Sequence, residues 1–152
     1  MKSLSKQQDR DEVVARLRQL CPESQRLWGR MSPHQMICHL SDSFRMAMGV
    51  RAAELVGNVF QRTVLKWVAL HAPLPWPKGY KTRPEADQEL GGTRPVEFAR
   101  DRQELEALLV QFTAAQKDFR WQAHPIFGAM AESEWMRWGY LHMDHHLRQF
   151  GL

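Results

Sequence analysis

The chain is poor in cysteine: its 152 residues include only two, Cys21 and Cys38. Two cysteines cannot form the disulfide framework that stabilises small secreted domains. The first residues, MKSLSKQQDRDE, also lack the apolar stretch of a secretory signal peptide. We therefore expect the protein to work in the reducing cytoplasm.

Long apolar runs and runs of like charge are missing as well. The most apolar stretch, VLKWVALHAPLPW, contains a lysine and several prolines and is shorter than the ~20 residues that a membrane-spanning helix needs. The net charge is only +4, and basic and acidic residues alternate along the chain instead of forming a basic tract. These features argue against a membrane partner and against a nucleic-acid partner.

Patterns typical of β-strands, internal repeats and interdomain linkers are absent too. No segment shows a sustained alternation of apolar and polar residues with a period of two. A chain of 152 residues has the length of one domain with one core. The sequence therefore predicts a single all-α domain that spans residues 1–152.

Helical segments are expected where apolar residues recur three and four positions apart. The expected segments are residues 6–20, 33–49, 52–71, 101–119 and 132–150. The second is the most clearly marked, because Ser32, Pro33 and Gln35 form a capping-box pattern and Gly49 suits the turn after its end. The predicted fold is a four-helix bundle with an additional helix and a long Pro-rich crossover loop.

The crossover loop, residues 73–95, is rich in proline and glycine. Long loops in compact domains are often functional. Leu74, Trp76 and Tyr80 offer apolar anchors, and the prolines reduce the entropy that is lost when the loop becomes ordered. We expect the loop to pack over one end of the bundle.

Three of the seven histidines, His142, His145 and His146, lie in the last helical segment. With about 100° per residue, His142 and His146 fall within about 40° of each other, so both imidazoles can reach one cation. His145 lies about 60° away, on the polar side. The same spacing also suits partly buried histidines that form hydrogen bonds and bind no metal.

A third ligand must come from another helix. The candidates are His34, His39, His71, His124 and the carboxylates. His39 is favoured because it lies in the middle of its helix at the margin of the apolar arc, and helix interiors position ligands better than frayed ends do.

Three segments carry a family resemblance: LWGRMSPHQMICHLSDS, LPWPKGYKTRPE and HPIFGAMAESEWMRWGYLHMDHHLRQFG. Together they resemble the DinB-like (YfiT-like) superfamily of metalloenzymes, and more closely a bacterial domain family of unknown function within it. The resemblance implies a four-helix bundle in which one histidine of the second helix and a His-x-x-x-His pair of the last helix hold a divalent cation, commonly nickel or zinc. These roles fall on His39, His142 and His146.

Two further positions can be compared with that superfamily. Gln149 matches the glutamine that commonly follows the histidine pair, whereas Leu147 and Arg148 stand where an Arg-Gly dipeptide is frequent. Ala131 stands where a serine or threonine would complete a capping box with Glu134. Neither departure removes a metal ligand, but the first changes the rim of the site.

Three histidine ligands leave a coordination position open, as in a catalytic site. The cation would lower the pKa of a bound water or thiol, or polarise a substrate carbonyl. The resemblance implies a hydrolase or a thiol-dependent transferase that acts on a small molecule with a low-molecular-weight thiol. Asp42, His145 and Gln149 are candidates for supporting or acid/base groups.

The alternative is a non-catalytic helical protein that binds metal, or only packs its histidines, and associates with itself as a homodimer or with another protein. Six tryptophans and eight methionines in so short a chain suit an adhesive helix face.

Overall fold

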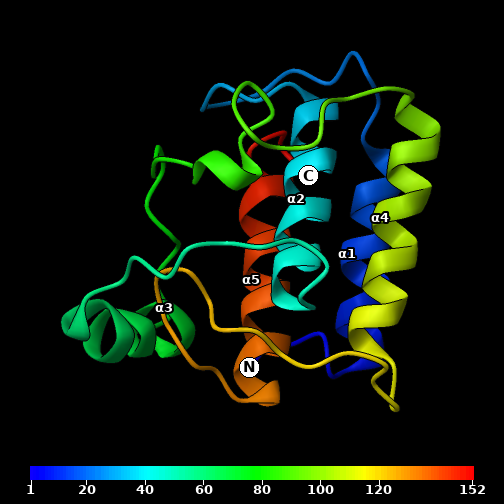
Figure 1. Ribbon diagram of the computed structural model, residues 1–152. Coiled ribbons are helices and arrows are strands. Elements are labelled where there is room, and N and C mark those ends of the chain that lie inside the picture. Colours follow the sequence, from blue (N-terminus) through cyan, green and yellow to red (C-terminus); the bar gives the residue numbers. More distant parts are fainter.

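The computed structural model describes residues 1–152 and contains five α-helices and no β-strand (Figure 1). The helices are α1 (Gln7–Gln19), α2 (Pro33–Ala47), α3 (Lys66–His71), α4 (Phe98–Thr113) and α5 (Glu132–Arg148). A π-helical turn, η1 (Gln61–Leu65), runs directly into α3, and a 3-10 turn, η2 (Pro84–Ala86), interrupts the long loop. The all-α class expected from the sequence is confirmed. None of the helices combines the length and the apolar character needed to cross a membrane.

The four longer helices pack around one hydrophobic cluster, whereas α3 lies to one side (Figure 1). Helix α2 contacts α4 and α5, and α5 also contacts α1. An ion pair between Arg18 and Glu106 joins α1 to α4. Trp135, Phe44 and Phe112 are the largest side chains at the centre of the cluster. Burial of each such side chain contributes about 1.5–3 kcal/mol or more, so the core fixes how α2 and α5 face each other.

The ends of α2 form as the sequence predicts. The Ser32 hydroxyl accepts a hydrogen bond from the Gln35 N–H, and the Gln35 side chain accepts one from the Ser32 N–H. Gly49 follows the helix with a positive φ of 80°, a conformation that glycine adopts without strain. Both ends of the helix that carries His39 are therefore fixed locally.

The prediction of a helix over residues 52–71 was wrong in its first third. Residues 52–58 are not helical, and the helical segment begins at residue 59. The N–H groups of Val56 and Gly57 donate to the Pro125 carbonyl, 2.8 and 3.0 Å away, instead of to a helix. The Asn58 side chain accepts a hydrogen bond from the Gln61 N–H at 2.9 Å and so caps the segment that does form.

The fourth helix is also displaced from the expected range. It begins at Phe98, because Glu97 caps it by accepting hydrogen bonds from the N–H groups of Ala99 and Arg100. It ends at Thr113, so Phe119 belongs to the following loop, where its ring packs edge-on against Trp121. The helical spacing of Phe119 reflected burial in a loop and did not indicate a longer helix.

The long loop lies against α2 through buried residues that the sequence did not single out. Ala86 and Gln88 are buried, and η2 contacts α2. Of the three expected anchors, only Trp76 is half-buried, and its indole N–H donates to the Ala69 carbonyl at 2.9 Å. Leu74 and Tyr80 are 67% and 58% exposed, so the expectation of three apolar anchors was wrong for these two.

Candidate metal centre

Three buried histidines meet between α2 and α5. His39 comes from α2, and His142 and His146 come from successive turns of α5. Their ring centroids are 5.1 Å apart for His39 and His142, 4.7 Å for His39 and His146, and 4.9 Å for His142 and His146. One ring nitrogen of each lies within 4.8 Å of the others. The fold thus brings together the three residues that the sequence singled out.

The orientation of His39 is fixed by the long loop. Its Nδ1 lies 2.9 Å from the carbonyl oxygen of Ala86, the last residue of η2. A carbonyl oxygen can only accept a hydrogen bond, so His39 Nδ1 carries the proton and Nε2 keeps its lone pair. The role of Ala86 could not be predicted from sequence, because a backbone carbonyl has no side-chain signature.

His146 is oriented by a second chain of hydrogen bonds. The Gln149 amide nitrogen donates to the Trp28 carbonyl at 2.9 Å, which directs Gln149 Oε1 toward His146 Nδ1 at 3.2 Å. His146 Nδ1 is therefore the donor, and its Nε2 keeps a lone pair. Gly29 makes this arrangement possible, because a Cβ at that position would lie 2.2 Å from Gln149 Nε2.

The nitrogen donors fit a divalent cation. The Nε2 atoms of His39 and His142 are 3.1 Å apart. Two nitrogens that bind one zinc ion at ~2.1 Å would be about 3.0–3.4 Å apart. Without a cation, His142 Nε2 could donate its proton to only one of the two lone pairs on His39 Nε2 and His146 Nε2, and the other would have no partner in the protein. A cation would satisfy all three nitrogens.

Burial keeps these imidazoles neutral. It lowers the pKa of His39 below its usual value of 6.5. Burial, followed by repulsion from the neighbouring histidines, lowers the pKa of His142 and of His146 well below that value. Because only the neutral imidazole binds a metal, the triad is ready to act as a ligand set at neutral pH.

The triad lines a cavity of about 390 Å³ between α2, α5, the helical segment 59–71 and the long loop. This volume falls within the range of small-molecule sites. More than half of the lining residues are hydrophobic, among them Leu65, Val68, Trp76, Trp135, Trp138 and Phe127. The cavity therefore joins a possible metal site to an apolar binding space.

His145 lies at the edge of this cavity, as expected for a residue on the more polar side of α5. Its ring is half-buried and packs edge-on against Trp28 at 4.8 Å, with Trp76 at 6.0 Å. It forms no hydrogen bond within the protein, and burial lowers its pKa to about 4. The sequence-based role of His145 in acid/base chemistry stays a prediction, and the geometry leaves both ring nitrogens free for it.

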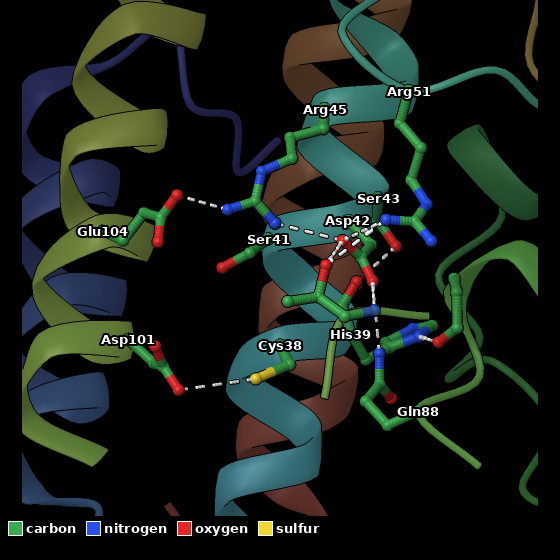
Figure 2. Close-up of polar contacts among 12 residues, drawn as sticks. Cys38, His39, Ser41, Asp42, Ser43, Arg45, Arg51, Gln88, Asp101 and Glu104 are labelled. Atoms are coloured by element: carbon green, nitrogen blue, oxygen red, sulfur yellow. Dashed lines mark hydrogen bonds and ion pairs between the residues drawn. The ribbon is translucent and has the colours of Figure 1, made fainter. Parts of the chain in front are cut away.

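Asp42, another candidate from the sequence, lies at the centre of a buried polar network (Figure 2). Its carboxylate accepts hydrogen bonds from Arg45 at 3.0 Å, from Arg51 at 3.1 Å and from both the N–H and the hydroxyl of Thr93 at 2.7 Å. Gln88 adds a contact at 3.4 Å. The network ties α2 to the loop that supplies the carbonyl partner of the α2 histidine.

A second group with three potential ligands joins α2 to the start of α4. His34 Nε2 lies 2.6 Å from Asp101 Oδ2, and the same oxygen accepts from the Val96 N–H at 3.0 Å. The Cys38 thiol approaches it at 3.8 Å (Figure 2). Burial, and then the charge of Asp101, raise the pKa of Cys38 to about 12. The thiol therefore stays protonated, and the three side chains link α2 to α4.

The two remaining histidines are not part of the triad. His71 is exposed and stacks on Trp67. His124 lines the cavity, but its Nδ1 accepts hydrogen bonds from the N–H groups of Ile126 and Phe127 at 3.2 and 3.1 Å. Burial lowers the pKa of His124 to about 3. Its ring is thus a neutral part of the turn that forms one wall.

Comparisons with known proteins place the chain in a family. Residues 2–151 match the family described as "Protein of unknown function (DUF1569)". Searches of curated proteins and of solved structures gave no match. Because the family match spans nearly the whole chain, this protein belongs to the DUF1569 family.

Proposed function

We propose that this protein is a divalent-metal-dependent enzyme of the DinB-like type, with its four longer helices as the bundle and residues 1–152 as one domain. The reaction is hydrolysis or a thiol-dependent transfer on a small molecule in the cytoplasm. The observation that carries the proposal is the placement of three neutral imidazoles in the wall of a cavity large enough for such a substrate.

The ligand set favours catalysis over a structural metal. Structural zinc sites are closed by four protein ligands, whereas three protein ligands leave one position open. Here that position would face the cavity, whose apolar walls limit access of water and strengthen electrostatic interactions. A bound nickel or zinc ion supplies Lewis acidity, which polarises a substrate oxygen or activates a nucleophile.

The residues around the triad have separate roles in this proposal. His39, His142 and His146 hold the cation. Gln149 orients His146 by its hydrogen bond, and such partners also raise the basicity of the ligand. His145 lies at the edge of the cavity and forms no hydrogen bond within the protein, so in this proposal it is the candidate acid/base group.

Activity of the metal-loaded protein tests the proposal. Untagged protein is loaded with zinc or with nickel, then assayed for hydrolysis of p-nitrophenyl acetate and for conjugation of cysteine to 1-chloro-2,4-dinitrobenzene. We expect turnover in at least one assay, with loss in chelator and in His142→Ala. His145→Ala should keep its metal but turn over more slowly, and Gln19→Ala, an exposed change on α1, should match the wild type. Equal rates with and without metal would refute the proposal.

A second candidate, self-association, is favoured by the outer face of the segment formed by η1 and α3. Phe60, Val64 and Trp67 lie on one side of this segment at helical spacing, and they are 60%, 51% and 62% exposed. Leu55, Val56 and Val59 are exposed just before them. With about 150–250 Å² per aromatic side chain, this face offers on the order of 600 Å². When two copies each bury such a face, the total buried area reaches the low end of the range for specific interfaces. The partner that we propose for this face is therefore a second copy of the chain.

Light scattering after gel filtration, with and without chelator, tests this candidate. We expect a weak dimer that the double variant Phe60→Ser, Trp67→Ser makes monomeric. Val110→Ser removes an equally exposed apolar side chain from α4 and should leave the dimer unchanged. A monomer at all concentrations would rule out self-association. A dimer that binds no metal would favour an interaction protein over an enzyme.

A further inference from the structure

We infer that the cavity recognises a small, mainly apolar molecule that carries one anionic group, such as a carboxylate, and that Lys81 and Arg83 bind this group. The inference rests on the proposed function, because it names the substrate class of the same cavity. It adds two residues of the segment LPWPKGYKTRPE to which the sequence analysis assigned no role.

The charges that line the cavity are all of one sign. Among the residues that form its walls, Lys81 and Arg83 are the only ones with a fixed charge, and no aspartate or glutamate is present. The rest are apolar, aromatic, histidine or hydroxyl side chains. An apolar cavity with two cations and no counter-charge in its wall attracts anions and selects against cations.

Both cations retain unused hydrogen-bond donors. The exposed Lys81 ammonium forms no hydrogen bond or ion pair in the protein, whereas the guanidinium groups of Arg45 and Arg51 each donate to two or more protein groups. Arg83 donates only one hydrogen bond, from Nη2 to Glu85 at 2.9 Å, and its Nε is buried without a partner. A guanidinium has five N–H donors, so Arg83 has capacity for an anion.

Glu85 does not cancel this capacity. Its side chain is not part of the cavity wall, and the oxygen that pairs with Arg83 also accepts a hydrogen bond from the Glu54 N–H at 3.3 Å. Glu85 therefore holds the guanidinium from outside the cavity. A carboxylate inside the cavity could add a second, charge-assisted hydrogen bond to the same group.

The position of the two cations relative to the triad is set by the loop. Lys81 and Arg83 lie just before η2, and the last residue of η2, Ala86, accepts the hydrogen bond from His39. The loop thus links the anion-binding groups to the orientation of a metal ligand. A substrate held at its anionic end by the loop would present its other end to the histidines.

A pair of probes that differ only in charge tests the inference. Binding of 3-phenylpropionate and of 3-phenylpropionamide is followed by the change in tryptophan fluorescence, since Trp76, Trp135 and Trp138 line the cavity. The titration is run on protein kept in chelator and again on zinc-loaded protein. We expect the acid to bind about tenfold more tightly than the amide in both, which corresponds to about 1.4 kcal/mol.

Variants assign this preference to residues. The double variant Lys81→Met, Arg83→Met should bind acid and amide equally, with the amide affinity unchanged. Lys78→Met removes an exposed cation of the same loop that does not line the cavity, and it should keep the tenfold preference.

Four results would overturn the inference. They are equal affinity for acid and amide in the wild type, binding of neither probe, a preference that survives in the double variant, and a preference seen only with zinc, which would place the carboxylate on the metal. An acid preference in a protein that takes up no metal would uphold the substrate class and refute the metal-dependent enzyme, so the two proposals fail separately.

Discussion

Trp135 and Trp67 both lie in helical segments with apolar residues three and four positions apart, yet Trp135 is 1% exposed and Trp67 is 62% exposed. Helix α5, which carries Trp135, contacts α1, α2 and α3, whereas α3, which carries Trp67, has its main contacts with α5 and with the adjoining turn η1. Helical periodicity indicates that a segment is amphipathic, but it does not reveal whether a second surface covers the apolar side.

The two segments also contribute differently to the cavity. Helix α5 supplies His142 and His146 from its well-packed interior, so the ligand geometry rests on the core. The segment 59–71 supplies apolar wall residues and contains the π-helical turn η1, an element that occurs frequently at functional sites. In the proposed enzyme, the well-packed helix α5 would position the metal ligands, and the less supported segment 59–71 would shape the space for a substrate.

The largest expected effect comes from the two tryptophans themselves. Trp135→Ala should lower the free energy of unfolding by about 3–5 kcal/mol, because it leaves a void in the core. Trp67→Ala should change it by less than about 0.5 kcal/mol. Urea denaturation at low protein concentration, where self-association does not contribute, measures both. Similar losses for the two variants would mean that the outer face of α3 is covered in the monomer.

Asp42→Ala should cost about 3 kcal/mol, because the half-buried Arg45 and Arg51 would lose an ion-pair partner and the N–H and hydroxyl of Thr93 would lose their acceptor. The long loop should then detach, and trypsin should cleave at Lys78 or Lys81 faster than in the wild type. Asp118→Ala, a change at an exposed carboxylate, is the matched control. Rapid cleavage of the wild type at these lysines would show instead that the loop is not held.

Acid should destabilise the protein in a defined range, with His124 as one cause. Its pKa is about 3 in the folded state and about 6.5 when unfolded, so its contribution to stability is complete above pH 6.5 and is lost as the pH falls toward 3. His124→Asn keeps an acceptor for the turn but cannot be protonated. Between pH 6 and 4, in chelator, the slope of unfolding free energy against pH should decrease by about 1.4 kcal/mol per unit. An unchanged slope would mean that protonation of His124 does not contribute to the loss of stability in acid.

Gln149→Leu should lower the metal affinity by about 10–100-fold and leave the fold intact. The variant removes the acceptor for His146 Nδ1 but none of the three ligands. A competitive titration with a chromophoric chelator measures the affinity, with Gln19→Leu as an exposed control. A complete loss of binding would mean that Gln149 is itself a ligand.

Sequence patterns predicted α2, α5 and the triad because their signals are local. The capping box of Ser32 and Gln35 lies within four residues, and His142 and His146 are one helical turn apart. His39 was favoured because it lies in the middle of its helix at the margin of the apolar arc, and the family resemblance supported this choice. The resemblance and the helical geometry thus pointed to the same residues.

Other features could not be predicted because they depend on contacts between distant segments. The partner of His39 is the backbone of Ala86, and the partner of Gln149 is the backbone of Trp28. Residues 52–58 have apolar residues at helical spacing but pair with the Pro125 carbonyl instead. Asn58 is a local signal for the true helix start, because asparagine is a preferred N-cap residue and its side chain caps this segment.

The metal content of single-histidine variants tests the central claim most directly. Untagged wild type, His39→Ala, His142→Ala, His146→Ala and His145→Ala are loaded with zinc, passed through gel filtration at pH 7.5 and analysed for bound metal. We predict about one ion per chain in the wild type and in His145→Ala, loss in the other three, and release from the wild type only when the pH falls well below 6.5, because burial lowers the pKa of His142 and His146. Equal metal content in all four variants would contradict the proposed site. Loss of metal in His145→Ala but not in His146→Ala would mean that His145, and not His146, binds the metal together with His142.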